Sequence, residues 1–336
     1  MDLTTTYLGL QLANPLVASA SPMSHTVEGV RRLAGAGVGS VVLHSLFEEE
    51  IEAEAERDAR LAEAGTERFA ESLTYFPDFP GADVAPRHYL DLLERARSAV
   101  EIPVMGSLNG TTPGGWARYA RQMQDAGAAA IELNTYQVPA DPGISAHDVE
   151  ERLVETVALV KSTVSVPVAV KLSPYLSSPA NLARRVEEAG ADGLVLFNRF
   201  LQPDIDTEVL GVVPGIGLSS PTEGRLALTW IALLRRQLRA DLAGTTGVET
   251  PDDLVKYLLA GADVVMSTSA LLRHGPEHAS VLLGGLADWM VRRGFKELGE
   301  MRGMLAVPPG VDATTHERAS YVTALRTANA SSYQRW

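Results

Sequence analysis

Polar side chains stand at the ends of otherwise apolar segments along most of the chain. A polar group that ends a buried segment needs a hydrogen-bond partner, because an unpaired buried polar group costs free energy. Amides, hydroxyls and one lysine recur at these ends, which predicts a ligand-binding face of mainly neutral hydrogen-bonding groups. The set comprises Ser19 and Ser21, His44 and Ser45, Ser107 and Asn109, Glu132 and Asn134, Lys171 and Ser173, Asn198 and Arg199, Thr245 to Gly247, and Ser267 to Ser269.

Lys171 ends the apolar segment VPVAVK (166–171), where a lysine is desolvated unless it faces a ligand. It could pair with a phosphate, stabilise an anionic ring, or form a Schiff base with a carbonyl substrate. The last option makes a lysine aldolase an alternative class of enzyme. The set contains no acid pair of the glycosidase type, and the chain has no H-E-x-x-H or H-x-H spacing for a metal. We therefore predict no metal site.

Two loops near the C-terminus have the character of a phosphate site. GTTGVETPDD (244–253) joins a glycine-rich turn to the start of a helix, and STSALL (267–272) begins another short helix. Backbone N–H groups at such turns attract anions. Loops after the last two strands of a parallel barrel commonly hold a phosphate. Taken together, the loops predict phosphate binding.

Eight apolar segments alternate with stretches of helical character, several of which end in Ala-Gly or Gly-Ala. Alternating strands and helices predict a parallel sheet with helical crossovers. Eight units that close on themselves form a (β/α)8 TIM barrel, and an open doubly wound sheet is the rival α/β arrangement. We favour the barrel because no G-x-G-x-x-G fingerprint follows the first segment. The segments are 15–21, 34–45, 102–109, 126–134, 166–173, 189–198, 239–247 and 260–269.

The remaining segments complete one domain. We expect an N-terminal β-hairpin over 4–15 and a long insertion after the second strand, 46–90, whose acidic stretch 47–65 predicts a solvated helix. The barrel spans 1–305, and the tail 306–336 is not a separate domain. The net charge of −13 repels phosphate backbones and anionic lipid, so neither nucleic acid nor a membrane is an expected partner. The absence of cysteine fits a cytoplasmic protein.

Six motifs follow one another in a fixed order: LGLQLANPLVASASP (8–22), IELNTYQVP (131–139), PVAVKLSP (167–174), GLSSP (217–221), GTTGV (244–248) and GFKELGEMRGML (294–305). In this order they resemble the dihydroorotate dehydrogenase family of flavin barrels, over about residues 3–305. The last motif is similar to a closing helix of that family.

The resemblance implies FMN as the cofactor. Matched residue by residue, one group would line the isoalloxazine ring and the ribityl chain: Ala20, Ser21, Ser45, Asn109, Asn134, Lys171 and Asn198. A second group would hold the phosphate end: Ser219, Thr246, Gly247, Thr268 and Ser269. Lys171 near the ring would stabilise its anionic reduced form.

Departures from the family pattern fall on the substrate side. Gln137 stands where the family has a Cys or Ser base, and an amide does not accept a proton at neutral pH. His44 and Tyr136 are the candidate bases in its place. Among the substrate-binding positions Asn134 and Asn198 are kept, Ser72 and Pro139 replace asparagines, Arg199 replaces Ser or Thr, and His44 replaces a lysine.

We therefore expect an FMN-dependent oxidoreductase acting on a CH–CH bond, in which hydride passes to flavin N5. The substrate would be dihydroorotate, as in pyrimidine biosynthesis, or a related small cyclic amide. A lysine aldolase using Lys171 and a non-catalytic flavin-binding interaction subunit are the alternatives. The resemblance also implies a homodimer. An electron-transfer partner would have to hold any iron–sulfur cluster, since this chain has no cysteine.

Overall fold

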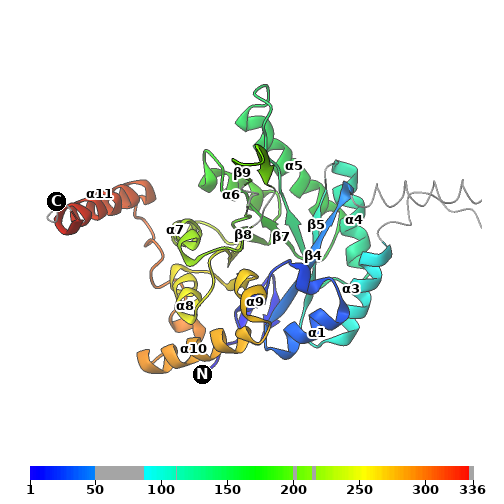
Figure 1. The fold of residues 1–336 in the computed structure, drawn as a ribbon, viewed down its shortest axis with the longest axis horizontal. Coiled ribbons are helices and arrows are strands. Elements are labelled where there is room, and N and C mark those ends of the chain that lie inside the picture. The colour runs from blue at the N-terminus through cyan, green and yellow to red at the C-terminus, as the bar shows by residue number, and fades with distance from the viewer. Residues whose placement is uncertain (50–86, 111, 200–202, 214–216, 333–336) are drawn as a thin grey trace, which may run out of the picture.

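The computed structural model describes residues 1–49, 87–110, 112–199, 203–213 and 217–332. Its central element is a closed parallel barrel with the strand order β11-β12-β3-β4-β5-β6-β7-β8 (Figure 1). This order confirms the predicted (β/α)8 barrel and rules out the open doubly wound sheet. The barrel strands are β3 (Leu16–Ala18), β4 (Ser40–Phe47), β5 (Val104–Asn109), β6 (Ile131–Asn134), β7 (Val168–Lys171), β8 (Gly193–Leu196), β11 (Asp241–Gly244) and β12 (Val264–Ser267).

Helices surround the barrel and connect its strands (Figure 1). Their starts follow local sequence signals: the Thr112 side chain caps α4 ahead of Pro113, and Thr250 with Asp253 forms a capping box on α8. The helices are α1 (Val27–Gly35), α3 (Arg87–Ala99), α4 (Pro113–Asp125), α5 (Ala146–Thr163), α6 (Pro179–Glu188), α7 (Gly224–Leu234), α8 (Pro251–Ala260), α9 (Ser269–His274), α10 (His278–Arg293) and α11 (Ala313–Ser332).

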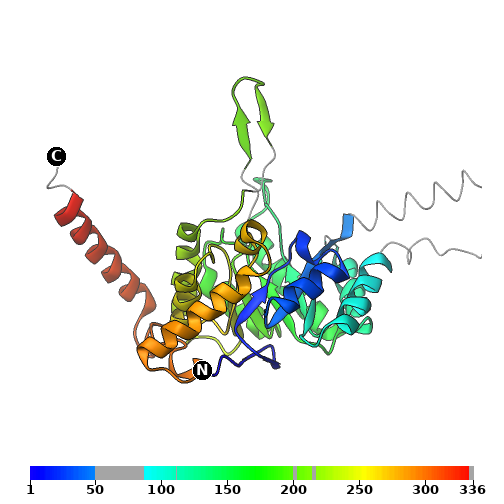
Figure 2. The ribbon, with the colours of Figure 1, turned by 60° about the horizontal axis from the view of Figure 1, so that its bottom comes forward.

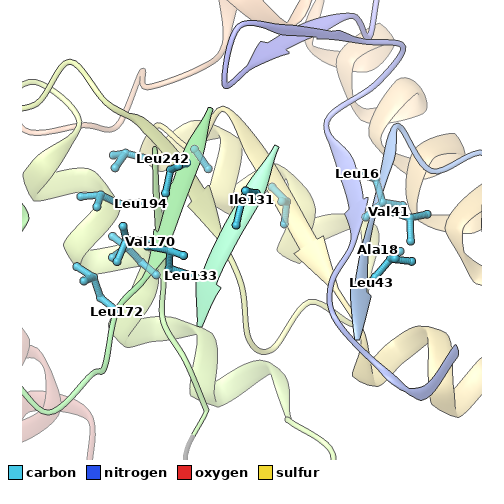
Figure 3. Packing of buried hydrophobic residues seen from close by; sticks show 14 of the residues in the cluster. Leu16, Ala18, Val41, Leu43, Ile131, Leu133, Val170, Leu172, Leu194 and Leu242 are labelled. Carbon is cyan, nitrogen blue, oxygen red and sulfur yellow. The ribbon is translucent and has the colours of Figure 1, made fainter. Parts of the chain in front are cut away.

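The strands bury both faces, as expected for a parallel barrel. One face packs against the helices, and Figure 3 shows part of this outer core with Leu43, Leu133 and Val170 among the labelled residues. The other face fills the barrel with a separate cluster that includes Val42 and Ala169. Because side chains alternate along a strand, this division sets which polar residues at the strand ends point into the barrel.

The predicted N-terminal hairpin is present as β1 (Thr5–Tyr7) and β2 (Leu10–Leu12). Tyr7, Leu8 and Leu12 belong to the cluster inside the barrel, and the Leu8 backbone N–H donates to Asp241 Oδ2 over 2.6 Å. Asp241 lies at the start of β11, so the hairpin covers the N-terminal end of the barrel. A ligand site is therefore expected at the opposite end, where the strands finish.

Two projecting elements were not predicted. A second hairpin, β9 (Asp204–Asp206) with β10 (Gly211–Val213), extends from the loop after β8 (Figure 2). Beyond Val307, whose N–H donates to Ala232 of α7, helix α11 extends away from the barrel (Figure 1). The motif 294–305 forms a short 3-10 turn, Leu298–Glu300, instead of the closing helix that its resemblance suggested.

Most of the insertion 46–90, including the acidic stretch and Ser72, lies outside the described residues. No helix within the described ranges is long and apolar enough to cross a membrane.

Candidate functional site

Lys171 and Glu132 form a buried ion pair at the C-terminal end of the barrel. On β6 and β7, Leu133 and Val170 face the helices, so alternation turns Glu132 and Lys171 inward. Lys171 Nζ lies 2.5 Å from Glu132 Oε1 and 3.5 Å from Ser19 Oγ. The two side chains are only 8% and 1% exposed, so each is the other's main polar partner out of water. The sequence placed Glu132 in the polar set but gave no sign that it would pair with Lys171.

A chain of hydrogen bonds links polar side chains at the ends of β4, β5, β6 and β8. Asn198 Nδ2 donates to Asn134 Oδ1 over 2.6 Å, and Asn134 Nδ2 donates to Ser45 Oγ over 3.0 Å. Ser45 and Ser107 hydroxyls are 2.8 Å apart. Each group fixes the orientation of the next, which pre-organises the amide edge of the site. The predicted residues Ser45, Asn134 and Asn198 are therefore brought together.

His44 lies apart from this chain because β4 contains a bulge. The pairing of β4 with β5 shifts by one residue between Val42 and Ser45. Such a bulge re-aims the side chains that follow it. Ser45 consequently meets Ser107, whereas the His44 ring lies 3.9 Å from the ring of His25 and 5.0 Å from that of Tyr89. Burial, with repulsion from His25, lowers the pKa of His44 to about 4.

The predicted phosphate loops converge through short polar contacts. Ser219 N and Oγ both donate to Ser269 Oγ, over 3.0 and 2.9 Å, and Gly247 N donates to Ser219 Oγ over 3.2 Å. The loop after β11 is held from behind by the Tyr257 hydroxyl, which lies 2.7 Å from the carbonyl oxygens of Thr245 and Thr246. Thr246 and Gly247 both have positive φ, +77° and +71°. This turn presents consecutive backbone N–H groups of the kind that bind anions.

A cavity of about 420 Å³ joins the lysine to these loops. Lys171 and Asn198 line it together with the phosphate loops, so groups that the sequence placed at one barrel end share one space. The predicted residues on its wall are Ala20, Ser21, Lys171, Asn198, Arg199, Ser219, Thr246, Gly247, Thr268 and Ser269.

Arg199 reaches across the loop that follows β8. Its Nε and Nη2 each lie 3.0 Å from Glu223 Oε1, and its Nη1 donates to the Gly217 carbonyl. Hydrogen bonds from Ser220 and pairing with Arg199 outweigh burial and lower the pKa of the Glu223 carboxyl. Glu223 was missed by sequence reasoning, since it lies 24 residues from Arg199 along the chain.

Four of the other predicted residues lie on a second cavity of about 600 Å³. Asn109, Tyr136, Gln137 and Pro139 line it, and none of them lines the first cavity. Thr135 stands between the two spaces, because its hydroxyl donates to the Lys171 carbonyl over 2.7 Å. Within the described part of the chain, no group of three or more His, Cys, Asp or Glu residues could hold a metal ion.

These features define a class of protein: a (β/α)8 barrel with a polar ligand cavity at the C-terminal ends of its strands. The family model for dihydroorotate dehydrogenase matches residues 2–290. The dihydroorotate dehydrogenase B (NAD(+)) catalytic subunit of Methanothermobacter thermautotrophicus is 28% identical over 309 residues, 90% of this chain and 98% of the relative. The protein of the same name from Listeria monocytogenes is 33% identical over 231 residues, 66% of this chain and 73% of the relative. The chain belongs to the dihydroorotate dehydrogenase family, as its motifs suggested.

Proposed function

We propose that this protein is an FMN-dependent oxidoreductase that takes hydride from a small cyclic amide related to dihydroorotate. The observation that carries the proposal is the cavity in which a buried lysine and a phosphate-type loop cluster share one wall. Its volume of about 420 Å³ lies in the range of small-molecule and cofactor sites. Membership of a family of flavin-dependent oxidoreductases supports the same conclusion.

The residues on the wall fit FMN. Ser21 Oγ is buried and has no hydrogen-bond partner among the described residues, so a ligand atom would satisfy it. Gly247 lets the loop after β11 pack closely against the 219–224 loop, since a Cβ there would stand 2.7 Å from the Ser220 carbonyl oxygen. Ser219, Thr246, Gly247, Thr268 and Ser269 would hold the phosphate end; Ala20, Ser21, Lys171 and Asn198 would line the ring, with Ser45 and Asn134 behind Asn198.

When bound, FMN would accept the hydride at its ring. Lys171 would place its ammonium group beside that ring, and the contact with Glu132 would orient it. The hydrogen-bonded side-chain amides of Asn198 and Asn134 would bind the polar edge of the substrate. Arg199 would face the opposite edge of the substrate. The hydrogen bonds that join Asn198, Asn134 and Ser45 would keep these side chains fixed while hydride moves.

The base that takes the substrate proton would have to be a residue other than Gln137. Gln137 stands at the family's base position, and its amide cannot accept a proton at neutral pH. Tyr136 shares the second cavity with Gln137, whereas His44 is turned away by the bulge and lines neither cavity. We therefore favour Tyr136 over His44 as the base.

The alternatives receive less support. A Schiff-base lysine must present an uncharged amine, and a carboxylate 2.5 Å from Nζ favours the ammonium form instead. A non-catalytic flavin-binding subunit would explain Gln137, but it would not require the ordered amide chain beside Lys171.

Several relatives are named as catalytic subunits, so we also propose that a separate electron-transfer protein reoxidises the flavin.

The hairpin β9–β10 carries four apolar side chains that are each at least 69% exposed: Ile205, Val209, Leu210 and Val212. We propose that this hairpin forms part of a homodimer surface. We expect the assembly to work in the cytoplasm.

Gly247→Asp tests the cofactor assignment. It adds a side chain where backbone atoms stand within 2.8 Å and places a negative charge at the phosphate loop. We expect FMN affinity to fall at least tenfold, measured by flavin absorbance after equilibrium dialysis. Gly284→Asp is the control, since a Cβ there meets nothing within 4 Å. Wild-type protein that takes up no FMN, or equal uptake by Gly247→Asp, would contradict the proposal.

A further inference from the structure

The larger cavity, of about 600 Å³, opens beside the ends of β5 and β6 and runs outward between α4 and α5. Its walls are mostly aromatic and aliphatic: Phe47, Trp116, Tyr136, Leu153, Tyr175 and Leu176. Trp116 on α4 is only 7% exposed, so this wall of the cavity is formed by residues of the hydrophobic core. A space of this size and lining fits an apolar ring or chain.

The polar atoms on the wall are mostly engaged within the protein. The Thr135 hydroxyl donates to the Lys171 carbonyl, and the Thr156 hydroxyl donates to the Arg152 carbonyl over 2.8 Å. Ser173 Oγ accepts from the Tyr175 N–H over 3.0 Å. Asn109 differs, because its Nδ2 is buried and has no partner among the described residues, although the residue is only 5% exposed. The inner end of the cavity therefore offers one amide donor to a ligand acceptor.

Charge at the cavity does not favour an anionic occupant. Its charged lining residues, within the described ranges, are Glu49, Glu150 and Arg152. Glu150 is held by Arg185 Nη1 at 3.3 Å, and Arg152 is exposed at the rim. The inner wall therefore suits an uncharged group.

The cavity begins next to the proposed reaction site. Asn109 lies on β5 two residues beyond Ser107, which is bonded to Ser45, and Thr135 follows Asn134 directly. A substrate held by Asn134 and Asn198 is thus adjacent to the mouth of the apolar space.

We propose that this cavity binds an apolar arm of about phenyl size on the substrate, with a carbonyl at its inner end accepting from Asn109 Nδ2. The inference rests on the proposed function and narrows its substrate class to cyclic amides with an apolar substituent. An unsubstituted ring such as dihydroorotate would leave the cavity unused.

The test compares two uncharged product analogues, uracil and 5-benzyluracil, by calorimetric titration into the FMN-loaded protein. We expect 5-benzyluracil to bind at least tenfold more tightly, because its ring leaves water for an apolar wall. Equal affinities in FMN-loaded protein would overturn this inference and leave the proposed oxidoreductase standing. Protein that binds no FMN would overturn both.

Leu153→Trp tests whether the benzyl group binds in this cavity, since the larger side chain on α5 would fill the space. We expect it to reduce the preference for 5-benzyluracil to below threefold. Leu159→Trp, on the same helix but 36% exposed and outside the cavity, should retain the tenfold preference. A preference unchanged by Leu153→Trp would show that the benzyl group lies elsewhere. If that variant fails to fold, Leu176→Trp, from the loop before α6, provides the same test, and the wild-type comparison still decides.

Discussion

The buried Lys171–Glu132 pair permits a quantitative test of how the site is held together. Removing one partner of such a pair leaves a buried charge uncompensated, which costs about 3–5 kcal/mol of unfolding free energy. Lys171→Met and Glu132→Gln should each show a loss of this size, since the side chains are 8% and 1% exposed. The double variant removes both charges and should lose only about 0–2 kcal/mol, because replacing a buried pair by uncharged groups is often nearly neutral.

Urea unfolding of the FMN-free protein, followed by far-UV circular dichroism, measures the four stabilities of this cycle. The pair Arg184–Glu188 on α6 is the matched control, with side chains 56% and 57% exposed. Its coupling should be about 0.3–0.5 kcal/mol, as for other exposed pairs on a helix.

Additive losses at Lys171 and Glu132 would refute the reasoning. The two residues would then be stabilised by separate partners, and Glu132 could not be the group that holds the lysine toward the cavity. A small loss in Glu132→Gln alone would mean that water reaches the ammonium group.

Three further changes test other parts of the structure. Burial lowers the pKa of His44 to about 4, so the unfolding free energy of the wild type should fall by about 1–2 kcal/mol between pH 7 and 4.5, allowing for partial exposure. This loss should be absent in His44→Gln. Wild type and variant that lose the same unfolding free energy in urea between the two pH values would contradict it. Thr246→Gly should stabilise the protein by about 0.5–1 kcal/mol in thermal unfolding, since φ is +77° there, whereas Thr245→Gly should destabilise it. Leu210→Glu, at the 87% exposed hairpin tip, should shift a dimer toward monomer in mass photometry, and an unchanged mass distribution would remove the hairpin from the interface.

The barrel was predictable because its strands are buried on both faces. PVAV (167–170) and its counterparts are continuous apolar runs, and eight alternating strand–helix units are compatible with few α/β architectures. The hairpin β9–β10 was not predicted, since DID and GVV are short, exposed and joined by a turn with Leu210 at positive φ instead of a glycine.

The sequence identified many of the residues that line the site, but it did not identify which side chains pair with one another. Strand ends identified Lys171, Asn198 and Gly247 because parallel strands bring their C-terminal ends to one edge. Glu132 and Glu223 pair across strands and loops, and no local pattern reports such partners. The separation of Ser45 from His44 depends on a one-residue bulge, which a regular alternation cannot anticipate.

The charges at the smaller cavity indicate how this acidic protein would bind the proposed anionic cofactor. The charged lining residues of the smaller cavity, within the described ranges, are Lys171 and Arg199, and each has its own carboxylate, Glu132 or Glu223. Because each cation is already paired with a carboxylate, neither adds a net positive charge that would attract a phosphate. In the proposed complex, hydroxyls and backbone N–H groups around Gly247 would therefore supply most of the phosphate binding. Lys171 and Arg199 would then act mainly on the reacting rings, since a fixed charge beside a developing charge is most effective when the protein already holds it in place.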